Sequence, residues 1–96
     1  MNVIFHSEAE REFLAAVDYY ETQQASLGED YQAEILATVS RIAKQPTVWP
    51  VLEGDVRRCL THRFPYGVLY SVEEDAIYIL AVMHLRRKPG YWKERV

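Results

Sequence analysis

The spacing of the apolar residues changes at Pro46, and this change constrains the fold more than any other feature of the sequence. Before Pro46, apolar residues such as Phe13, Ala16 and Tyr20 recur every three or four positions, which is the period of an amphipathic helix. Further along, they alternate or form short runs, as in residues 66–72, which is typical of strands. The chain is therefore predicted to be an α+β domain with its helices before most of its strands.

Two helices are predicted in the first half of the chain. Ser7 and Glu10 have the spacing of a capping box, so the first helix is expected over residues 8–24. Residues 26–28, Ser-Leu-Gly, break it. The second helix is expected over residues 29–45, because two acidic residues suit its N-terminus and a proline follows its end. Helices joined by so short a break are antiparallel neighbours.

Four strands are predicted around this hairpin, over residues 2–6, 56–63, 66–72 and 76–84. In the third strand alternate residues share one face, namely Tyr66, Val68, Tyr70 and Val72. The last strand is apolar on both faces and is placed in the centre of the sheet, and short connections make the last three strands an antiparallel meander. The predicted fold is α+β with the order β-α-α-β-β-β, an antiparallel helical hairpin packed on a small, mainly antiparallel sheet.

The remaining segments and the length complete this prediction. Residues 46–54 are expected to form a loop in which Trp49 fills the core, and residues 85–96 a basic, aromatic tail. Ninety-six residues suit one domain over positions 1–96. The chain starts without a signal-peptide pattern, lacks the apolar run of about 20 residues that a membrane span needs, and has one cysteine, which suits a reducing compartment. We expect a cytoplasmic protein without membrane contact.

The net charge of −3 conceals an asymmetry between the two halves. Residues 1–53 contain three basic and nine acidic residues, a balance of −6. Residues 54–96 contain eight basic and five acidic residues, a balance of +3. Such a division favours an anionic partner for the basic half, although solvated glutamates on helix surfaces produce the same pattern.

Few residues of this chain match the motifs of enzymes. The histidines at 6, 62 and 84 lack the spacing and the cysteine partners of a zinc site, so no metal is expected, and no cofactor-binding motif is present. Cys59 lies in a predicted strand and is expected to be a packed residue rather than a nucleophile. The acidic residues of the helices alternate with core positions and are expected to face solvent.

A cluster of cations and aromatic side chains in the basic half is the candidate site. Arg57 and Arg58 are adjacent and therefore point to opposite faces of their strand, and the meander brings one of them toward His84 and the tail. The planar guanidinium of arginine binds phosphate and carboxylate groups in a bidentate manner. The candidate target-binding or partner-binding residues are Arg57, Arg58, Arg63, Arg86, Arg87, Lys88 and Trp92.

The residues alone leave the partner of this cluster open. Nucleic acid and an acidic protein fit equally well. Tyr91 and Trp92 could stack on bases or fill a partner's groove, whereas Trp92 could instead cap the core. The paired arginines could equally be neutralised by Glu53 or Asp55.

A set of motifs, taken in order along essentially all 96 residues, resembles a known family. The motifs are Tyr19-Tyr20-Glu21, Gly28-Glu29, Pro46 with Trp49-Pro50, Arg57-Arg58, Arg63-Phe64-Pro65-Tyr66, Tyr70, and His84 followed by Arg86-Arg87, Pro89 and Tyr91-Trp92. Their order and spacing resemble the RelE/ParE superfamily of toxins from bacterial type II toxin–antitoxin pairs. The resemblance implies a helical hairpin against a small antiparallel sheet, in agreement with the fold predicted above.

The resemblance also implies a growth-inhibiting toxin that a cognate antitoxin neutralises. Antitoxins of this kind lay an extended or helical segment over the toxin, and the complex binds operator DNA only through the antitoxin. RelE-like members cut mRNA in the ribosome without a metal, whereas ParE-like members inhibit DNA gyrase and are not known to do chemistry. Neither branch implies a cofactor.

The residues at the nuclease positions favour the ParE-like branch. RelE-like nucleases carry an arginine at the start of the third predicted strand, just before a Leu-Val-Tyr-like run, and here Gly67 stands in its place. If the protein were nonetheless a nuclease, the catalytic residues would be His84, Arg86, Arg87 and Tyr91, since metal-free cleavage needs cations and an acid or base. A third hypothesis is an inactive module that only binds the antitoxin.

Overall fold

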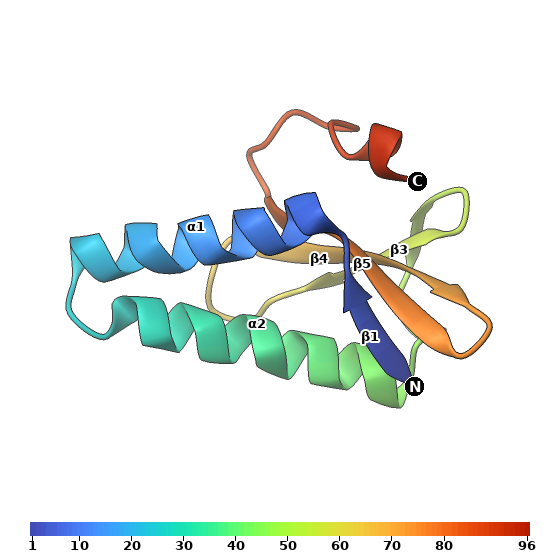
Figure 1. Ribbon diagram of the computed structural model, residues 1–96, viewed down its shortest axis with the longest axis horizontal. Coiled ribbons are helices and arrows are strands. Elements are labelled where there is room, and N and C mark those ends of the chain that lie inside the picture. The colour runs from blue at the N-terminus through green and yellow to red at the C-terminus, as the bar shows by residue number, and fades with distance from the viewer.

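The computed structural model describes residues 1–96 as two helices packed on one face of a five-stranded sheet (Figure 1). In chain order the elements are β1 (Asn2–Phe5), α1 (Ser7–Gln23), α2 (Leu27–Lys44), β2 (Val51–Glu53), β3 (Val56–Leu60), β4 (Tyr66–Glu73), β5 (Ala76–His84) and the 3-10 turn η1 (Lys93–Arg95). The α+β class and the helical hairpin are confirmed, with β2 as an additional strand. Neither helix has the length and hydropathy to cross a membrane.

The sheet has the strand order β1-β5-β4-β3-β2. Only the β1–β5 pair is parallel, and the meander from β3 to β5 is antiparallel as predicted. The middle position belongs to β4, not to β5 as expected, because the additional strand β2 extends the sheet on one side. Nevertheless β5 is an interior strand, and it is apolar on both faces because both faces of the sheet are covered by other parts of the chain.

A register shift in the β4–β5 pair determines which apolar residues of these strands point to each face of the sheet. Leu69 is opposite Ala81 while Tyr70 is opposite Ile79, so Leu80 is the extra residue of a bulge. The predicted common face of β4 is confirmed, since its alternate residues from Tyr66 to Val72 all pack in the core under the hairpin. Leu69, Leu80 and Ala81 belong to a second cluster on the opposite face.

The hairpin is held by close contact between α1 and α2 at their connection. A Cβ atom on Gly28 would lie 2.5 Å from the carbonyl oxygen of Val17, so only glycine fits there. The Glu21 carboxylate accepts hydrogen bonds from the backbone N–H groups of Ser26 at 2.9 Å and Gly28 at 3.0 Å. An acidic side chain of α1 therefore satisfies the free N–H groups at the start of α2.

Both helices begin differently from the prediction. His6, rather than Ser7, is the N-cap of α1, because its Nδ1 accepts the Glu8 N–H at 3.1 Å. The backbone of His6 is still extended and donates to the Ile79 carbonyl, so the strand leads directly into the helix. The second helix begins at Leu27 and not at residue 29, since Ser26 with φ 72° already completes the turn.

The segment between α2 and β4 contains the other differences. Part of the predicted loop forms β2, which joins β3 through a turn at Gly54 with φ 56°. The strand β3 ends at Leu60 and not at Arg63, because Thr61 N–H bonds to the Tyr66 carbonyl at 3.0 Å and closes a loop. Trp49 packs against the main core as expected.

Candidate functional site

The tail leaves the sheet at His84, the last residue of β5. The His84 ring packs edge-on against Tyr66 with centroids 5.1 Å apart, and its Nδ1 accepts the backbone N–H of Arg86 at 3.0 Å. The Leu85 N–H bonds to the Pro65 carbonyl at 2.9 Å. These contacts orient the backbone of the turn, while the Arg86 side chain is exposed and makes no ion pair.

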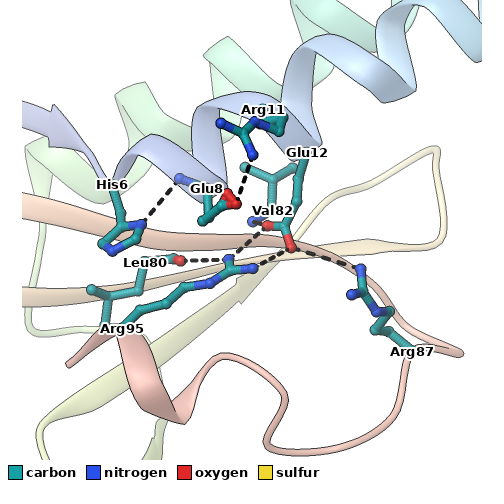
Figure 2. Close-up of polar contacts among 8 residues, drawn as sticks. All are labelled: His6, Glu8, Arg11, Glu12, Leu80, Val82, Arg87 and Arg95. Carbon is teal, nitrogen blue, oxygen red and sulfur yellow. Dashed lines mark hydrogen bonds and ion pairs between the residues drawn. The ribbon is translucent and has the colours of Figure 1, made fainter.

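Farther along the tail, two arginines converge on one carboxylate of α1 (Figure 2). Arg95 Nη2 lies 2.9 Å from Glu12 Oε2, and Arg95 Nη1 lies 3.0 Å from Glu12 Oε1. Arg87 Nη1 approaches the same Oε2 at 3.8 Å. The Arg95 and Glu12 side chains are only 13% and 15% exposed, so this bidentate pair has a lower local dielectric than a surface pair.

The same pair closes part of the edge of β5. Beyond the end of β1, the Val82 N–H donates to Glu12 Oε1 at 3.1 Å and Arg95 Nη1 donates to the Leu80 carbonyl at 3.0 Å. Figure 2 shows both backbone groups bound by the side chains of the pair. Because β1 is too short to pair with this part of β5, an ion pair satisfies backbone groups that a strand would otherwise bond.

Tyr91 lies beneath both arginines of this network. The guanidinium carbons of Arg87 and Arg95 are 4.0 Å and 5.0 Å from its ring centroid, within the range of cation–π attraction. Burial raises the pKa of Tyr91, and the Glu12 carboxylate raises it further. The hydrogen bond to Glu12 raises the pKa of Arg95. The phenol therefore holds its proton, and the guanidinium remains charged.

Trp92 is a core residue of the second, smaller cluster. It is 3% exposed and packs with Leu69, Leu80 and Met83 on the helix-free face of the sheet. The alternative in which Trp92 caps the core is therefore the one that the structure supports. Trp92 holds the tail against the sheet, and almost none of its side chain is available for direct contact with a partner.

The paired arginines of β3 have opposite surroundings, as the strand periodicity predicts. Arg57 is half-buried and donates to the Trp49 carbonyl at 2.7 Å. Arg58 makes no ion pair and lines a hollow on the other side together with Arg87 and Lys93. Arg58, and not Arg57, is therefore the member of the pair that the fold brings toward the tail.

The place of the missing nuclease arginine is occupied from a neighbouring strand. A Cβ atom on Gly67 would lie 3.1 Å from both Cγ and Cδ of Arg58. The aliphatic stem of Arg58 thus lies across the bare backbone of Gly67, and its guanidinium belongs to this part of the surface. The absence of a charged side chain at position 67 does not leave the surface uncharged.

The remaining predicted cations are separated from the Glu12 network. Arg63 pairs with Asp30 of α2 at 3.2 Å, and its guanidinium carbon lies 5.2 Å from the Phe64 ring centroid. Lys88 is exposed and makes no ion pair. Cys59 is 1% exposed and its pKa is raised by burial, in keeping with a packed residue. No group of three histidine, cysteine, aspartate or glutamate side chains is arranged to hold a metal ion.

Glu12 and Arg95 are the two residues of the site that sequence reasoning missed. The acidic residues of the helices were expected to face solvent, which is wrong for Glu12, because it turns toward β5 and the tail. The pair spans 83 positions, and no periodicity links residues so far apart. Glu12 stands beside core residue Phe13, but Glu8 and Glu10 also stand beside a core residue, Ala9, so position along the helix gave no local signal.

Comparisons with known proteins agree with this architecture. Residues 3–89 match the family model described as the ParE toxin of the type II toxin-antitoxin system, parDE. A solved structure described as a chromosomal ParDE TA system from P. aeruginosa superposes with a TM-score of 0.66 at 18% identity, covering 90% of this chain and 97% of that one. At that identity the superposition shows the fold. No curated protein sequence matches significantly.

Proposed function

We propose that this chain stops growth by binding DNA gyrase without carrying out a chemical step itself. The chain belongs to the ParE family and is the toxin of a type II toxin–antitoxin pair. ParE-like toxins act on gyrase, and the ParDE pairing implies a cognate antitoxin as the other partner of this chain. The target-binding surface would be the exposed turn after β5, with Arg86 and Lys88 as its free cations.

The burial of the Tyr91 hydroxyl group is the observation that carries this proposal. A nuclease of the RelE-like kind would need Tyr91 or His84 as a proton donor or acceptor. Tyr91 lies under two guanidinium groups with its pKa raised by burial, and His84 Nδ1 is already bonded to the Arg86 N–H. Arg87 forms an ion pair with Glu12. These contacts favour a surface that docks on a partner over one that cuts RNA.

A gyrase supercoiling assay with purified toxin tests this proposal. We expect the wild-type protein to inhibit supercoiling or to accumulate cleavage complexes at micromolar concentration. Arg86→Ala is expected to weaken inhibition at least tenfold with the fold intact, because an exposed unpaired cation contributes to binding and not to packing. The matched control is Arg11→Ala, an exposed arginine of α1 that pairs locally with Glu8, which should stay within twofold of wild type.

Two other outcomes would point to the remaining hypotheses. Growth arrest with intact gyrase activity and newly cleaved transcripts, mapped at their 5′ ends, would support the ribosome-dependent nuclease and contradict gyrase binding. Robust expression without any growth arrest and without an antitoxin would support the inactive module. If Arg86→Ala inhibits gyrase as strongly as wild type, the surface after β5 is not the target-binding surface.

A further inference from the structure

Gly67 leaves a gap on the helix-free face of the sheet, and the side chain of Arg58 fills it. In the β3–β4 pair Leu60 is opposite Gly67, and Arg58 lies two residues before Leu60 on the same face. Arg58 and Gly67 are therefore diagonal neighbours. Gly67 is buried because the Arg58 stem covers it. On the other side of Gly67 lies Met83 of β5, so the gap lets Arg58 extend across β4 toward the tail.

A hollow between β3 and the tail is the place that this extension reaches. It has a volume of about 270 Å³ and is lined by residues of β2, β3, the end of β5 and the tail, Arg58 among them. Met83 and Leu85, which is 43% exposed, form part of its apolar wall. Because the Arg58 stem is packed over Gly67, the guanidinium at its end lies beyond Gly67, along the hollow. A group that enters the hollow meets a positive charge and apolar sides.

Of the three cations that line this hollow, Arg58 is the one without an acidic partner. Arg87 pairs with Glu12 at 3.8 Å, and Lys93 pairs with Glu53 at 3.1 Å. Arg58 takes part in none of the ion pairs of the molecule. Its planar guanidinium therefore keeps a free pair of donors that suits a carboxylate or a phosphate. The hollow is complementary to one anionic group.

We propose that Arg58 binds an acidic side chain of gyrase and that Gly67 is the positioning residue that lets Arg58 reach it. The carboxylate accepts hydrogen bonds from the Arg58 guanidinium, while apolar atoms beside the carboxylate contact Leu85. This inference rests on the proposed gyrase-binding function. It extends the target-binding surface from Arg86 and Lys88 on the turn to the face of β3.

A DNA phosphate is the competing occupant, because gyrase acts on DNA. Duplex DNA presents rows of phosphates that several cations neutralise together, and Arg58 is the one free cation of this hollow. A phosphate backbone would also leave the apolar wall at Leu85 without a suitable partner, whereas an acidic side chain on a protein surface has apolar neighbours. One free cation beside an apolar wall therefore favours a carboxylate of a protein.

Calorimetric titration of DNA-free gyrase with the purified toxin tests the proposal. Arg58→Ala is expected to weaken binding at least tenfold, because it leaves the acidic side chain of gyrase without its partner. The matched control is Lys44→Ala, since Lys44 is an exposed cation at the end of α2 without an ion pair, and its affinity should stay within twofold of wild type. Urea unfolding of each variant verifies the fold.

A second variant separates the position of the charge from the charge itself. Gly67→Val retains Arg58 but fills the gap with a branched side chain that suits a strand, so the stem must leave and binding should again weaken at least tenfold. If Gly67→Val does not fold, Gly67→Ala replaces it with a smaller expected loss, because its Cβ would lie 3.1 Å from the Arg58 stem. When either variant is combined with Arg58→Ala, the loss should stay within twofold of that of Arg58→Ala alone. Losses that add in full would show that Gly67 does not act through Arg58.

The binding of wild type and Arg58→Ala separates failure of this inference from failure of the proposed function. If wild type binds gyrase and Arg58→Ala binds equally well, the hollow is not part of the target-binding surface, and the proposed function stands. If the loss appears only with gyrase bound to DNA, the occupant is a phosphate and the carboxylate is wrong. Wild-type toxin that binds neither form of gyrase would overturn the proposed function and this inference together.

Discussion

The two faces of the sheet are covered by different means. On one face the hairpin closes a cluster of 14 buried residues, in which aromatic rings such as Tyr31 and Phe13 pack 6.1 Å apart. On the other face the tail closes a cluster of six residues through Trp92. The first cover consists of two long helices, whereas the second is an irregular segment fastened by the Glu12–Arg95 ion pair.

This difference has a consequence for the energetics of the molecule. Apolar burial over a broad area is non-directional and depends on no single contact. An ion pair with several hydrogen bonds depends on both partners, because removing one leaves the other buried and unpaired. We therefore expect the hairpin side to determine global stability and the tail side to open locally. The exposed cations proposed to bind gyrase lie on the less stable of the two regions.

Removal of side-chain volume from the main core has the largest expected effect on stability. Ile35 is fully buried between α2 and the sheet, so Ile35→Ala should lower the free energy of unfolding by about 2–5 kcal/mol, through lost burial and a residual cavity. The neighbouring exposed residue provides the control: Leu36→Ala should change the free energy of unfolding by less than about 0.5 kcal/mol. Urea unfolding measures both. Equal effects would contradict the assignment of the main core.

Disruption of the tail network has an intermediate expected effect. Glu12→Gln removes the charge that faces Arg95 and Arg87 and should cost about 1.5–3 kcal/mol, the range for hydrogen bonds to charged groups. The tail should also become sensitive to trypsin while the hairpin remains protected. Glu10→Gln is the matched control, because Glu10 is an exposed acid of the same helix without an ion pair. A tail that stays resistant in Glu12→Gln would show that Trp92 alone fastens it.

Loss of one buried hydroxyl has the smallest expected effect near neutral pH. Tyr70→Phe removes the hydrogen bond to the Pro46 carbonyl at 2.7 Å and should cost about 0.5–1.5 kcal/mol. Burial raises the pKa of Tyr70 from 10.0 to about 12, so the folded state holds the phenolic proton more tightly than the unfolded state. Its stabilisation is complete below the unfolded pKa of about 10 and is lost as the pH rises through about 12.

The pH dependence distinguishes this tyrosine from a surface one. Between pH 10 and 12 the stability of Tyr70→Phe, measured by urea unfolding, should decline less steeply than that of wild type. Tyr19→Phe is the control, because Tyr19 is exposed, and it should follow the wild-type curve. Tyr66, whose pKa burial also raises to about 12, continues to titrate in both variants. If the stability of Tyr70→Phe declined between pH 10 and 12 as steeply as that of wild type, the assignment of this decline to Tyr70 would be wrong.

The hairpin side could be predicted from the sequence because its signals are local. The helical spacing around Phe13 and Ile35 and the alternation along β4 both repeat within a few residues, so each element indicates its own buried face. The antiparallel meander followed from short connections. The errors in this region concern boundaries, such as His6 as the cap of α1 and Ser26 in a left-handed turn.

The candidate site was predictable only as a set of charges. The sequence indicated that cations gather in the basic half, and the structure separates them by their partners, so that Arg57 bonds to a backbone carbonyl while Arg86 is free. The β2 strand was missed because three residues after two prolines carry no periodic signal. The burial of Trp92 was left open because one aromatic residue after a Pro-Gly turn fits a core and a surface equally.

By itself, the sequence determined the fold class, the hairpin and its apolar face, and the family to which the toxin belongs. Only the tertiary structure decided which charges remain available to a partner. The charges of Glu12 and Arg95 neutralise each other because the fold brings the two side chains within 2.9 Å. Arg58, whose aliphatic stem lies over the backbone of Gly67, remains without an acidic partner. Hydrophobic periodicity is a property of neighbours along the chain, but the neutralisation of a charge depends on distance in space.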